Sequence, residues 1–459
     1  MIGVDTIAAI STAVGEAGIG IVRLSGKDAI EVGNKVFQGV NKKELLAGEN
    51  KKLLYGHIVD GEKVIDEVLI ARMNEPYTYT RENMVEIYCH GGIISVRKIL
   101  ELLLKNGARL AEAGEFTKRA FLNGRLDLSQ AEAVIDIINS KTEKSLEVSV
   151  NQLDGGLSDK IGDIRHDLMG MIAHVEASID FPEDGIEEVT FEQLNETGSK
   201  VKKDIEALLA TSTRGKILRD GIKTVILGRP NVGKSSLLNK ILNEERAIVT
   251  DIPGTTRDTI EEFVSIDGIP LRIVDTAGIR QTDDLVEQIG VDRARDVIQS
   301  ADLVIGIFDA SREIDEEDRE IIDLVNSKNS IVLLNKIDLN EDYDLDYLEG
   351  LLDDKEIIKT SMIEDLGIEE LLERIQDIFY SGQVDMDSDI VITNIRHKDQ
   401  LEKSLANIES ALEDIQLEVP LDCIEVDLQD CWNNLGEISG DTISEDVLDR
   451  VFEEFCIGK

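Results

Sequence analysis

Residues 228–235 constrain the fold of this chain more than any other part of its sequence. They read Gly-Arg-Pro-Asn-Val-Gly-Lys-Ser and fit the pattern G-x-x-x-x-G-K-S. A short apolar run, residues 225–227, precedes them, and a helix-like sequence follows at residues 236–239. Glycines at these positions let successive backbone N–H groups and the start of a helix face negative charge. The segment predicts a strand, a phosphate-binding loop and a helix, the alternative being a chance glycine-rich turn.

Short apolar runs then recur along the next hundred residues. They lie at residues 225–227, 271–274, 303–308 and 331–334, and helical periodicity follows each one after a polar loop. This alternation is typical of βαβ units on a mainly parallel sheet. We therefore expect an α/β nucleotide-binding domain over residues 216–382.

Three segments after the loop suit a guanine nucleotide with Mg²⁺. Asp275-Thr276-Ala277-Gly278 ends one apolar run, where Asp275 can hold Mg²⁺ through water and the Gly278 amide can meet the γ-phosphate. Asn335-Lys336-Ile337-Asp338 ends another, and the Asp338 carboxylate can accept both the N1–H and the amino group of guanine. Adenine offers no such pair of donors. Ser361, followed by Met362, stands where a last loop would cover the base.

Roles for individual residues follow from phosphoryl-transfer chemistry. Lys234 would reach the β- and γ-phosphates, while the Ser235 hydroxyl and Thr256, in a candidate switch at residues 250–258, would bind Mg²⁺. Ile279 follows Gly278, so no glutamine stands there to orient the attacking water. The expected GTP-binding residues are Asn231, Val232, Gly233, Lys234, Ser235, Ser236, Thr250, Asp251, Ile252, Pro253, Gly254, Thr255, Thr256, Asp275, Thr276, Ala277, Gly278, Asn335, Lys336, Asp338, Ser361 and Met362.

The length and net charge of the chain limit the number of further domains and the kinds of partner it can have. A chain of 459 residues predicts two to four domains, and 49 basic against 93 acidic residues give a net charge of −44. The negative electrostatic field of such a chain repels nucleic-acid phosphates, so a basic partner would have to supply most of the affinity for any nucleic acid. A solvated acidic surface is the alternative interpretation. The four cysteines form no C-x-x-C pair, which predicts a reducing cytoplasm, and neither a signal peptide nor a membrane helix is expected.

The flanking regions predict two further kinds of structure. Residues 1–120 mix β-like runs with helical segments and suggest a small α/β domain. Helical patterns dominate residues 121–215 and 383–459; in the second, Leu401, Leu405, Ile408, Leu412 and Ile415 form one apolar stripe. The simplest topology is a helical domain in two parts, with residues 216–382 inserted between them.

Three segments outside the nucleotide-binding domain resemble one family. Residues 114–124 read Gly-Glu-Phe-Thr-Lys-Arg-Ala-Phe-Leu-Asn-Gly, residues 127–133 read Asp-Leu-Ser-Gln-Ala-Glu-Ala, and the chain ends Phe-Cys-Ile-Gly-Lys. With the nucleotide motifs, they make the chain similar to the MnmE (TrmE) family of tRNA-modification GTPases along essentially its whole length. The resemblance implies a homodimer whose G domains pair across their nucleotides, and a K⁺ ion in the place of an arginine finger.

The resemblance also assigns residues to these roles. Asn231, Thr250, Ile252 and Thr255 would hold K⁺, with Ile252 offering only its carbonyl, and an asparagine oxygen beside the phosphates suits such an ion. Glu287 matches the family's glutamate that positions water, which makes Glu287, Lys234 and Thr256 the expected catalytic residues. Without the resemblance, Glu287 would be interpreted as a surface helix carboxylate.

In the family, the N-terminal domain binds 5-formyltetrahydrofolate or a related tetrahydrofolate and mediates dimerisation. The matching positions are Arg23, Glu86, Arg125 and the terminal Lys459. A carboxylate suits the pterin's N–H groups, and cations suit its glutamate tail. From sequence alone, Arg23 and Glu86 would be strand residues in a salt bridge. Cys456 is either a bystander or a residue near the folate chemistry.

The function implied is GTP hydrolysis that gates carboxymethylaminomethyl or aminomethyl modification of the tRNA wobble uridine, U34. The resemblance implies an FAD-containing MnmG-type partner, in a heterotetramer or larger complex, that supplies most of the tRNA binding. Two alternatives stay open. A ribosome-assembly GTPase would carry a basic RNA-binding module, and a folate-binding scaffold with a vestigial GTPase would lack Lys234 or Asp338.

Overall fold

The structure is a computed structural model, and it describes most of the chain. The described residues are 5–13, 15–40, 44–180, 191–244, 261–266, 268–274, 298–340, 343, 345–353, 355–380 and 390–459. The chain forms two compact units, one of Met1–Ile135, Gln152–Val201 and Ala406–Lys459, the other of Asp136–Asn151 and Lys202–Leu405. Within the described ranges, no helix is both long and apolar enough to cross a membrane.

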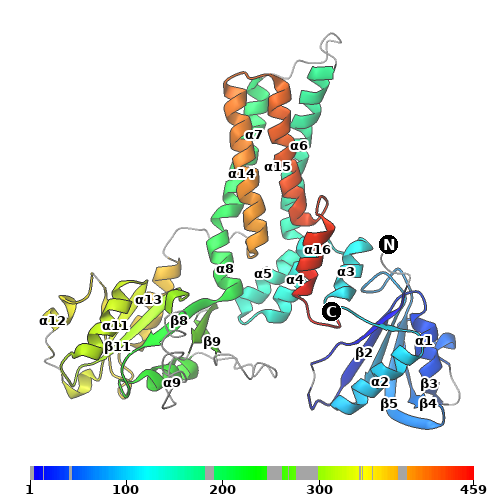
Figure 1. The fold of residues 1–459 in the computed structure, drawn as a ribbon, viewed down its shortest axis with the longest axis horizontal. Helices are drawn as coiled ribbons and strands as arrows, with labels where there is room; N and C mark the ends of the chain where they lie inside the picture. The colour runs from blue at the N-terminus through cyan, green and yellow to red at the C-terminus, as the bar shows by residue number, and fades with distance from the viewer. Residues whose placement is uncertain are drawn as a thin grey trace. The chain divides into compact units, whose positions relative to one another are not determined.

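The first unit contains a seven-stranded sheet with the order β3-β4-β5-β6-β2-β1-β7. Figure 1 labels β2, β3, β4 and β5 of this sheet. Neighbouring strands are antiparallel, except that β1 runs parallel to β7. The strands are β1 (Ile7–Ile10), β2 (Gly20–Ser25), β3 (Phe37–Gly39), β4 (Leu53–Asp60), β5 (Lys63–Met73), β6 (Met84–Cys89) and β7 (Arg109–Leu110). The helical elements among them are α1 (Ala29–Val36), η2 (Leu45–Ala47) and α2 (Ile93–Lys105).

Alternate residues of these strands point to one face of the sheet and form the core of this domain. Val22 and Leu24 of β2 face inward and pack with Val32 of α1 and Ile99 of α2, all at most 2% exposed. In a strand with this alternation, one set of side chains packs in the core and the other set points to the opposite face of the sheet. The small α/β domain expected at the N-terminus is confirmed.

Long helices continue the first unit and extend into the second. They are α3 (Glu115–Leu122), α4 (Leu128–Asn139), α5 (Glu143–Asp154), α6 (Gly156–Asp180), α7 (Phe191–Ala210), α8 (Ser212–Asp220), α14 (Ile395–Gln416), α15 (Leu421–Ser439) and α16 (Glu445–Glu453). Helix α6 packs against α15, which follows it by more than two hundred residues in the sequence. Their buried rows include Leu168 of α6 and Leu428 of α15. A helical domain made from two separate parts of the chain is thereby confirmed.

The second unit holds a six-stranded sheet with the order β13-β12-β11-β8-β10-β9. Its described elements are β8 (Ile222–Leu227), α9 (Lys234–Glu244), β9 (Glu261–Ile266), β10 (Ile269–Val274), β11 (Leu303–Asp309), α11 (Glu316–Asn326), β12 (Ser330–Asn335), η4 (Ile337–Leu339), α12 (Leu345–Glu349), β13 (Ile357–Thr360) and α13 (Ile368–Tyr380). The strands pair in parallel except for β9, which is antiparallel to β10. The mainly parallel sheet is confirmed, and β9 adds an edge hairpin that the apolar runs had not indicated.

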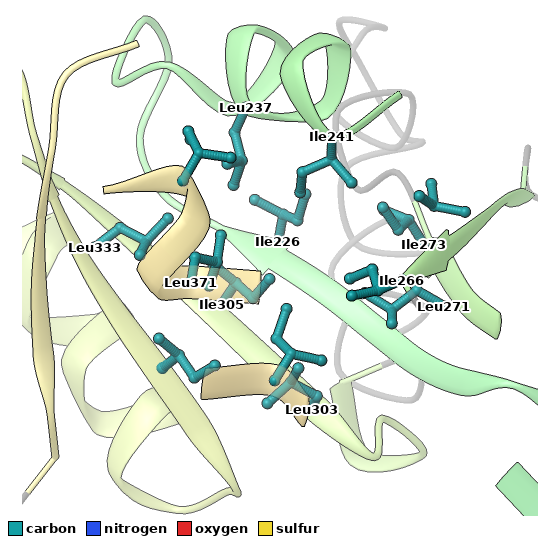
Figure 2. Packing of buried hydrophobic residues seen from close by; sticks show 14 of the residues in the cluster. Ile226, Leu237, Ile241, Ile266, Leu271, Ile273, Leu303, Ile305, Leu333 and Leu371 are labelled. Carbon is teal, nitrogen blue, oxygen red and sulfur yellow. The ribbon is translucent and has the colours of Figure 1, made fainter. Parts of the chain in front are cut away.

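Both faces of this sheet are buried, which explains the continuous apolar runs. On one face, Ile305 of β11 and Ile226 of β8 pack with Leu237 of α9 and Leu371 of α13 (Figure 2). On the other face, Val304 packs with residues of α11 and α12. Successive residues of one strand therefore reach opposite cores, as the two-residue period of a strand requires.

The segments that lead into and out of the second sheet are neighbours. The Ile392 amide, just before α14, donates to the Thr211 hydroxyl, just before α8, over 3.0 Å. Gly215 of α8 comes so close that an added Cβ would lie 2.0 Å from the Ile392 carbonyl oxygen. The chain therefore enters and leaves this α/β region at nearly the same point.

Candidate nucleotide-binding site

The phosphate loop lies between the end of β8 and the start of α9. Two of its residues have left-handed backbones, Asn231 at φ 65° and Gly233 at φ 113°. A Cβ on Gly233 would lie 2.3 Å from the Asn335 amide nitrogen, so only glycine fits there. The Lys234 ammonium donates to the carbonyls of Gly228, at 2.6 Å, and Arg229, at 2.7 Å. The loop thus has the wrapped backbone that its sequence predicted.

The segment after β12 is joined directly to the phosphate loop. The Asn335 side chain is 2% exposed and its amide donates to the Val232 carbonyl over 2.7 Å. Its own oxygen accepts from the Thr360 hydroxyl at 3.3 Å. Next to it, the Asp338 carboxylate accepts from the Ser361 hydroxyl at 2.7 Å. The two segments that would meet the phosphates and the base therefore share one hydrogen-bond network.

Sheet topology explains why distant segments meet here. Strands β8, β12 and β13 belong to the parallel part of the sheet, so their carboxyl ends lie at one edge. At this edge lie those expected nucleotide-binding residues that the structure describes, apart from Met362: Asn231, Val232, Gly233, Lys234, Ser235, Ser236, Asn335, Lys336, Asp338 and Ser361. The side chain of Met362 is 8% exposed and packs in the core of the sheet, so its role at the nucleotide stays a prediction.

The other predicted residues of this site lie outside the described residues. They are Thr250, Asp251, Ile252, Pro253, Gly254, Thr255 and Thr256 of the candidate switch, Asp275, Thr276, Ala277 and Gly278, together with Ile279 and Glu287. The second Mg²⁺ ligand, three of the four expected K⁺ ligands and the expected water-positioning glutamate stay predictions.

A second group of predicted residues gathers in the N-terminal domain. Arg23 of β2 and Glu86 of β6 are direct partners in the sheet, and the Arg23 Nε donates to Glu86 Oε1 over 2.9 Å. The salt bridge expected from the sequence alone is therefore present. The Tyr88 hydroxyl donates to Glu86 Oε2 at 2.6 Å, and burial together with this carboxylate raises the pKa of Tyr88 to about 12.

Arg125 and the C-terminal tail lie beside this pair. The guanidinium groups of Arg23 and Arg125 lie 5.9 and 4.6 Å from the centre of the Tyr79 ring. An Arg23 guanidinium nitrogen is 3.5 Å from the Gly458 carbonyl oxygen, and Gly458 packs against the Ile10 carbonyl. Arg23, Glu86, Arg125 and the residue before Lys459 thus form one cluster. The Cys456 side chain is exposed next to it in the chain.

Comparison with known proteins decides the family. The model described as "GTP-binding protein TrmE N-terminus" matches residues 6–125, and the "MnmE helical domain" model matches residues 128–456. The protein named tRNA modification GTPase MnmE of Clostridioides difficile is 54% identical, and that of Alkaliphilus oremlandii is 52% identical, each over 99% of both chains. The MnmE of Finegoldia magna is 54% identical over 99% of this chain and 100% of its own.

The chain belongs to the MnmE (TrmE) family of tRNA modification GTPases. It is accordingly a GTPase, as its motifs predicted. Among solved structures, that of Era from Aquifex aeolicus covers 40% of this chain and 66% of its own, with 25% identity and a TM-score of 0.29.

The structure of this MnmE-family GTPase adds residues that the sequence reasoning missed. Asp309, at the end of β11, is 7% exposed and accepts a hydrogen bond from the Lys336 ammonium over 2.6 Å. Burial opposes its ionisation, but hydrogen bonds from Lys336 and Ser311 outweigh burial and lower the pKa of Asp309. A carboxylate directly after a fully apolar run was the sequence signal that could have found it.

Proposed function

We propose that this GTPase binds GTP across residues 228–236 and 335–338 and serves the modification of tRNA wobble uridine in the cytoplasm. The observation that carries the nucleotide part is the hydrogen bond from Asn335 to the Val232 carbonyl. It joins the base-reading segment to the phosphate loop, so that one molecule can engage both. Asp338, held by Ser361, offers its carboxylate to the N1–H and amino group of guanine.

Mg²⁺ fits the oxygen donors expected beside the phosphates. Ser235 follows Lys234 in the first turn of α9 and lines a hollow together with Ile273 and Val274. Its hydroxyl and that of Thr256 are the hard ligands that Mg²⁺ prefers, with Asp275 acting through water. Mg²⁺ would neutralise charge on the phosphate oxygens, and Lys234 would add a second positive charge near the β- and γ-phosphates.

We further propose K⁺ as the additional cation of the hydrolysis reaction. Support comes from Asn231, whose left-handed backbone places it at the turn of the phosphate loop, and from the absence of a glutamine after Gly278 in the sequence. Asn231, Thr250 and Thr255 would contribute oxygen ligands together with the Ile252 carbonyl. Glu287 would orient the attacking water.

The Arg23 cluster is our candidate site for 5-formyltetrahydrofolate or a related folate. Glu86 uses one oxygen for Arg23 and the other for Tyr88. A carboxylate can accept about four hydrogen bonds, so Glu86 keeps capacity for the pterin's N–H groups. Arg23, Arg125 and Lys459 would meet the glutamate tail of the folate. The reactivity of Cys456 belongs to this part of the proposal.

Assembly is also proposed rather than observed. From the family resemblance we propose a homodimer that works with an FAD-containing MnmG-type partner in a heterotetramer or larger complex. The net charge of −44 supports a basic partner. We propose four parts: residues 1–120 for folate binding and dimerisation, 121–215 and 383–459 for the helical domain, and 216–382 for the G domain. The junction between family matches at residues 125 and 128 supports the first boundary.

Two measurements test this function. The GTPase rate of the full chain should be several-fold higher in KCl than in NaCl of equal ionic strength. Cells that lack the protein should lose the wobble-uridine modification and regain it with the wild-type gene, but not with a Lys234→Ala variant, which lacks the phosphate-binding ammonium. Equal rates in the two salts, together with intact modification in the deletion strain, would show that the proposal is wrong.

A further inference from the structure

Three contacts tie the end of β11 to the segment after β12. The Ala310 amide donates to the Asn335 carbonyl at 2.8 Å. The Asn340 side chain donates to the Ala310 carbonyl at 2.9 Å, and the Lys336 ammonium donates to the Asp309 carboxylate at 2.6 Å. The last of these is the only one of the three between charged side chains. Residues 335–340 are therefore supported along their length by the neighbouring strand end.

Asp309 is itself held in place. Its Oδ1 accepts from the Ser311 amide at 2.9 Å and the Ser311 hydroxyl at 2.6 Å, which leaves Oδ2 to face Lys336. The carboxylate is 7% exposed, whereas the Lys336 side chain is 30% exposed. A buried, doubly hydrogen-bonded carboxylate is a rigid anchor for a long and otherwise mobile lysine side chain.

The anchored lysine has an uncommon backbone. Lys336 has φ 65° and ψ 35°, in the left-handed region that side chains other than glycine seldom adopt. This turn ends β12 and begins the short helix η4, which contains Asp338. If Lys336 relaxed to a right-handed conformation, Asp338 would leave the position in which Ser361 holds it. The ammonium contact opposes that relaxation.

We propose that Asp309 is a positioning residue for guanine binding, which acts by holding the Lys336 ammonium and thereby keeps residues 335–338 in the conformation that presents Asp338 to the base. This inference rests on the proposed reading of guanine by Asp338. Asp309 touches no nucleotide in this scheme and acts only through Lys336.

A double-mutant cycle distinguishes this role from simple support of β11. Asp309→Asn removes the charge that attracts Lys336 but keeps an oxygen for Ser311. Lys336→Met keeps the apolar stem and removes the ammonium, without altering β11. If Asp309 acts through Lys336, the two changes affect nucleotide binding through one interaction, and their effects do not multiply.

The readout is the rate at which a fluorescent GDP analogue leaves the full chain. Loss of a hydrogen bond between charged groups is expected to speed release about tenfold in Asp309→Asn. Lys336→Met should speed release at least as much, because Lys336 is also among the residues expected to bind the nucleotide. The double variant should release GDP no faster than Lys336→Met alone, because Lys336→Met by itself leaves the Asp309 carboxylate buried without its cation. Asp309→Asn should also raise the KM for GTP more than it lowers kcat. Release rates that multiply in the double variant would overturn the proposal.

Asp318→Asn is the matched control. Asp318 is 1% exposed, follows the same strand and pairs with Arg312 at 2.9 Å. Its side chain accepts from the amide of Asp315, the N-cap of α11, and within the described part of the chain no hydrogen bond or ion pair joins it to residues 335–340. It should lower the thermal midpoint and leave GDP release unaltered; faster release would also overturn the proposal.

Asp338→Asn separates two hypotheses: that Asp338 reads guanine, and that Asp309 positions residues 335–338 for this reading. If it leaves the preference for guanine over xanthine nucleotides intact, the proposed base reading fails, and this inference fails with it. If the preference shifts while the Asp309 and Lys336 effects multiply, this inference alone fails.

Discussion

Arg119 is the largest charged side chain in the interior of the N-terminal domain, with 2% of it exposed. Its guanidinium contacts Glu115 Oε1 and Asp5 Oδ1, each at 2.8 Å, and Glu82 at 3.2 Å. Arg109 provides a second cation, 2.6 Å from Glu115. This network explains why the segment 114–124 carries charged residues on a helix that packs inward. Its role is to attach α3 to the sheet, which no single motif revealed.

Replacing Arg119 should therefore be severe. Arg119→Met removes the cation that pairs with Glu82 and leaves Glu115 with Arg109 alone. Removing one partner of a buried pair costs roughly 3–5 kcal/mol. The adjacent Lys118 supplies a control, because its partner Asp449 is 59% exposed and such a pair contributes at most about 1 kcal/mol. Urea denaturation should give a much lower midpoint for Arg119→Met than for Lys118→Met. Equal midpoints would contradict this account of the network.

The same network predicts how stability depends on pH. Burial raises the pKa of Glu115, but hydrogen bonds from Arg109, the Glu112 amide and Arg119 outweigh burial and lower it below its ordinary value of 4.5. Hydrogen bonds from Arg109 and Arg119 likewise lower the pKa of Asp5 below 3.8. A carboxyl with a lowered pKa stabilises the fold fully above its unfolded value, and this contribution is lost as the pH falls through the folded value. The difference in unfolding free energy between wild type and Arg119→Met should be constant near pH 7 and shrink below pH 4.5, as urea titrations at several pH values would show. A difference that grows on acidification would contradict this.

At the scale of elements, the sequence predicted those strands and loops best whose formation depends on neighbouring residues in the chain. Strands β8, β10, β11 and β12 were predicted because strands buried on both faces need mostly apolar runs, although Arg272 interrupts the run of β10. The edge strand β9 was not predicted, because its sequence, Glu-Glu-Phe-Val-Ser-Ile, begins with two charged residues. The contacts of the nucleotide loops followed from the parallel topology. The partner of Asp309 did not, because a strand-end carboxylate carries no local sign of which side chain it will meet.

The junction of α8 with the segment before α14 gives a prediction at this scale. Gly215→Ala places a Cβ 2.0 Å from a backbone carbonyl oxygen, which cannot rotate away, so the Ile392 segment must shift at a cost of roughly 1–3 kcal/mol. Hydrogen exchange at the Ile392 amide, which donates to Thr211, should accelerate. Gly162→Ala on α6, where no atom lies within 4 Å, should instead stabilise its helix by about 0.5–1 kcal/mol. Unaltered exchange at Ile392 in Gly215→Ala would argue against a tight junction.

At the scale of the whole molecule, charge and topology point to a division of labour. A net charge of −44 repels the phosphates of an RNA, which supports the proposal that a partner supplies most of the affinity for tRNA. The described residues of the N-terminal cluster lie in one compact unit, and the described residues of the nucleotide loops lie in the other. Each set of side chains can therefore be assembled by its own unit.

The adjacent entry and exit of the α/β region have a further consequence for how such a chain can evolve and be engineered. Because Gly215 and Ile392 are neighbours, the polypeptide between them can be exchanged as a cassette without changing the distance that the remaining chain must span. A short linker in its place would reconnect the helical parts, and another domain with close termini could be spliced in. A single in-frame exchange within the gene could thus replace the nucleotide-binding module and leave the helical parts around it unchanged.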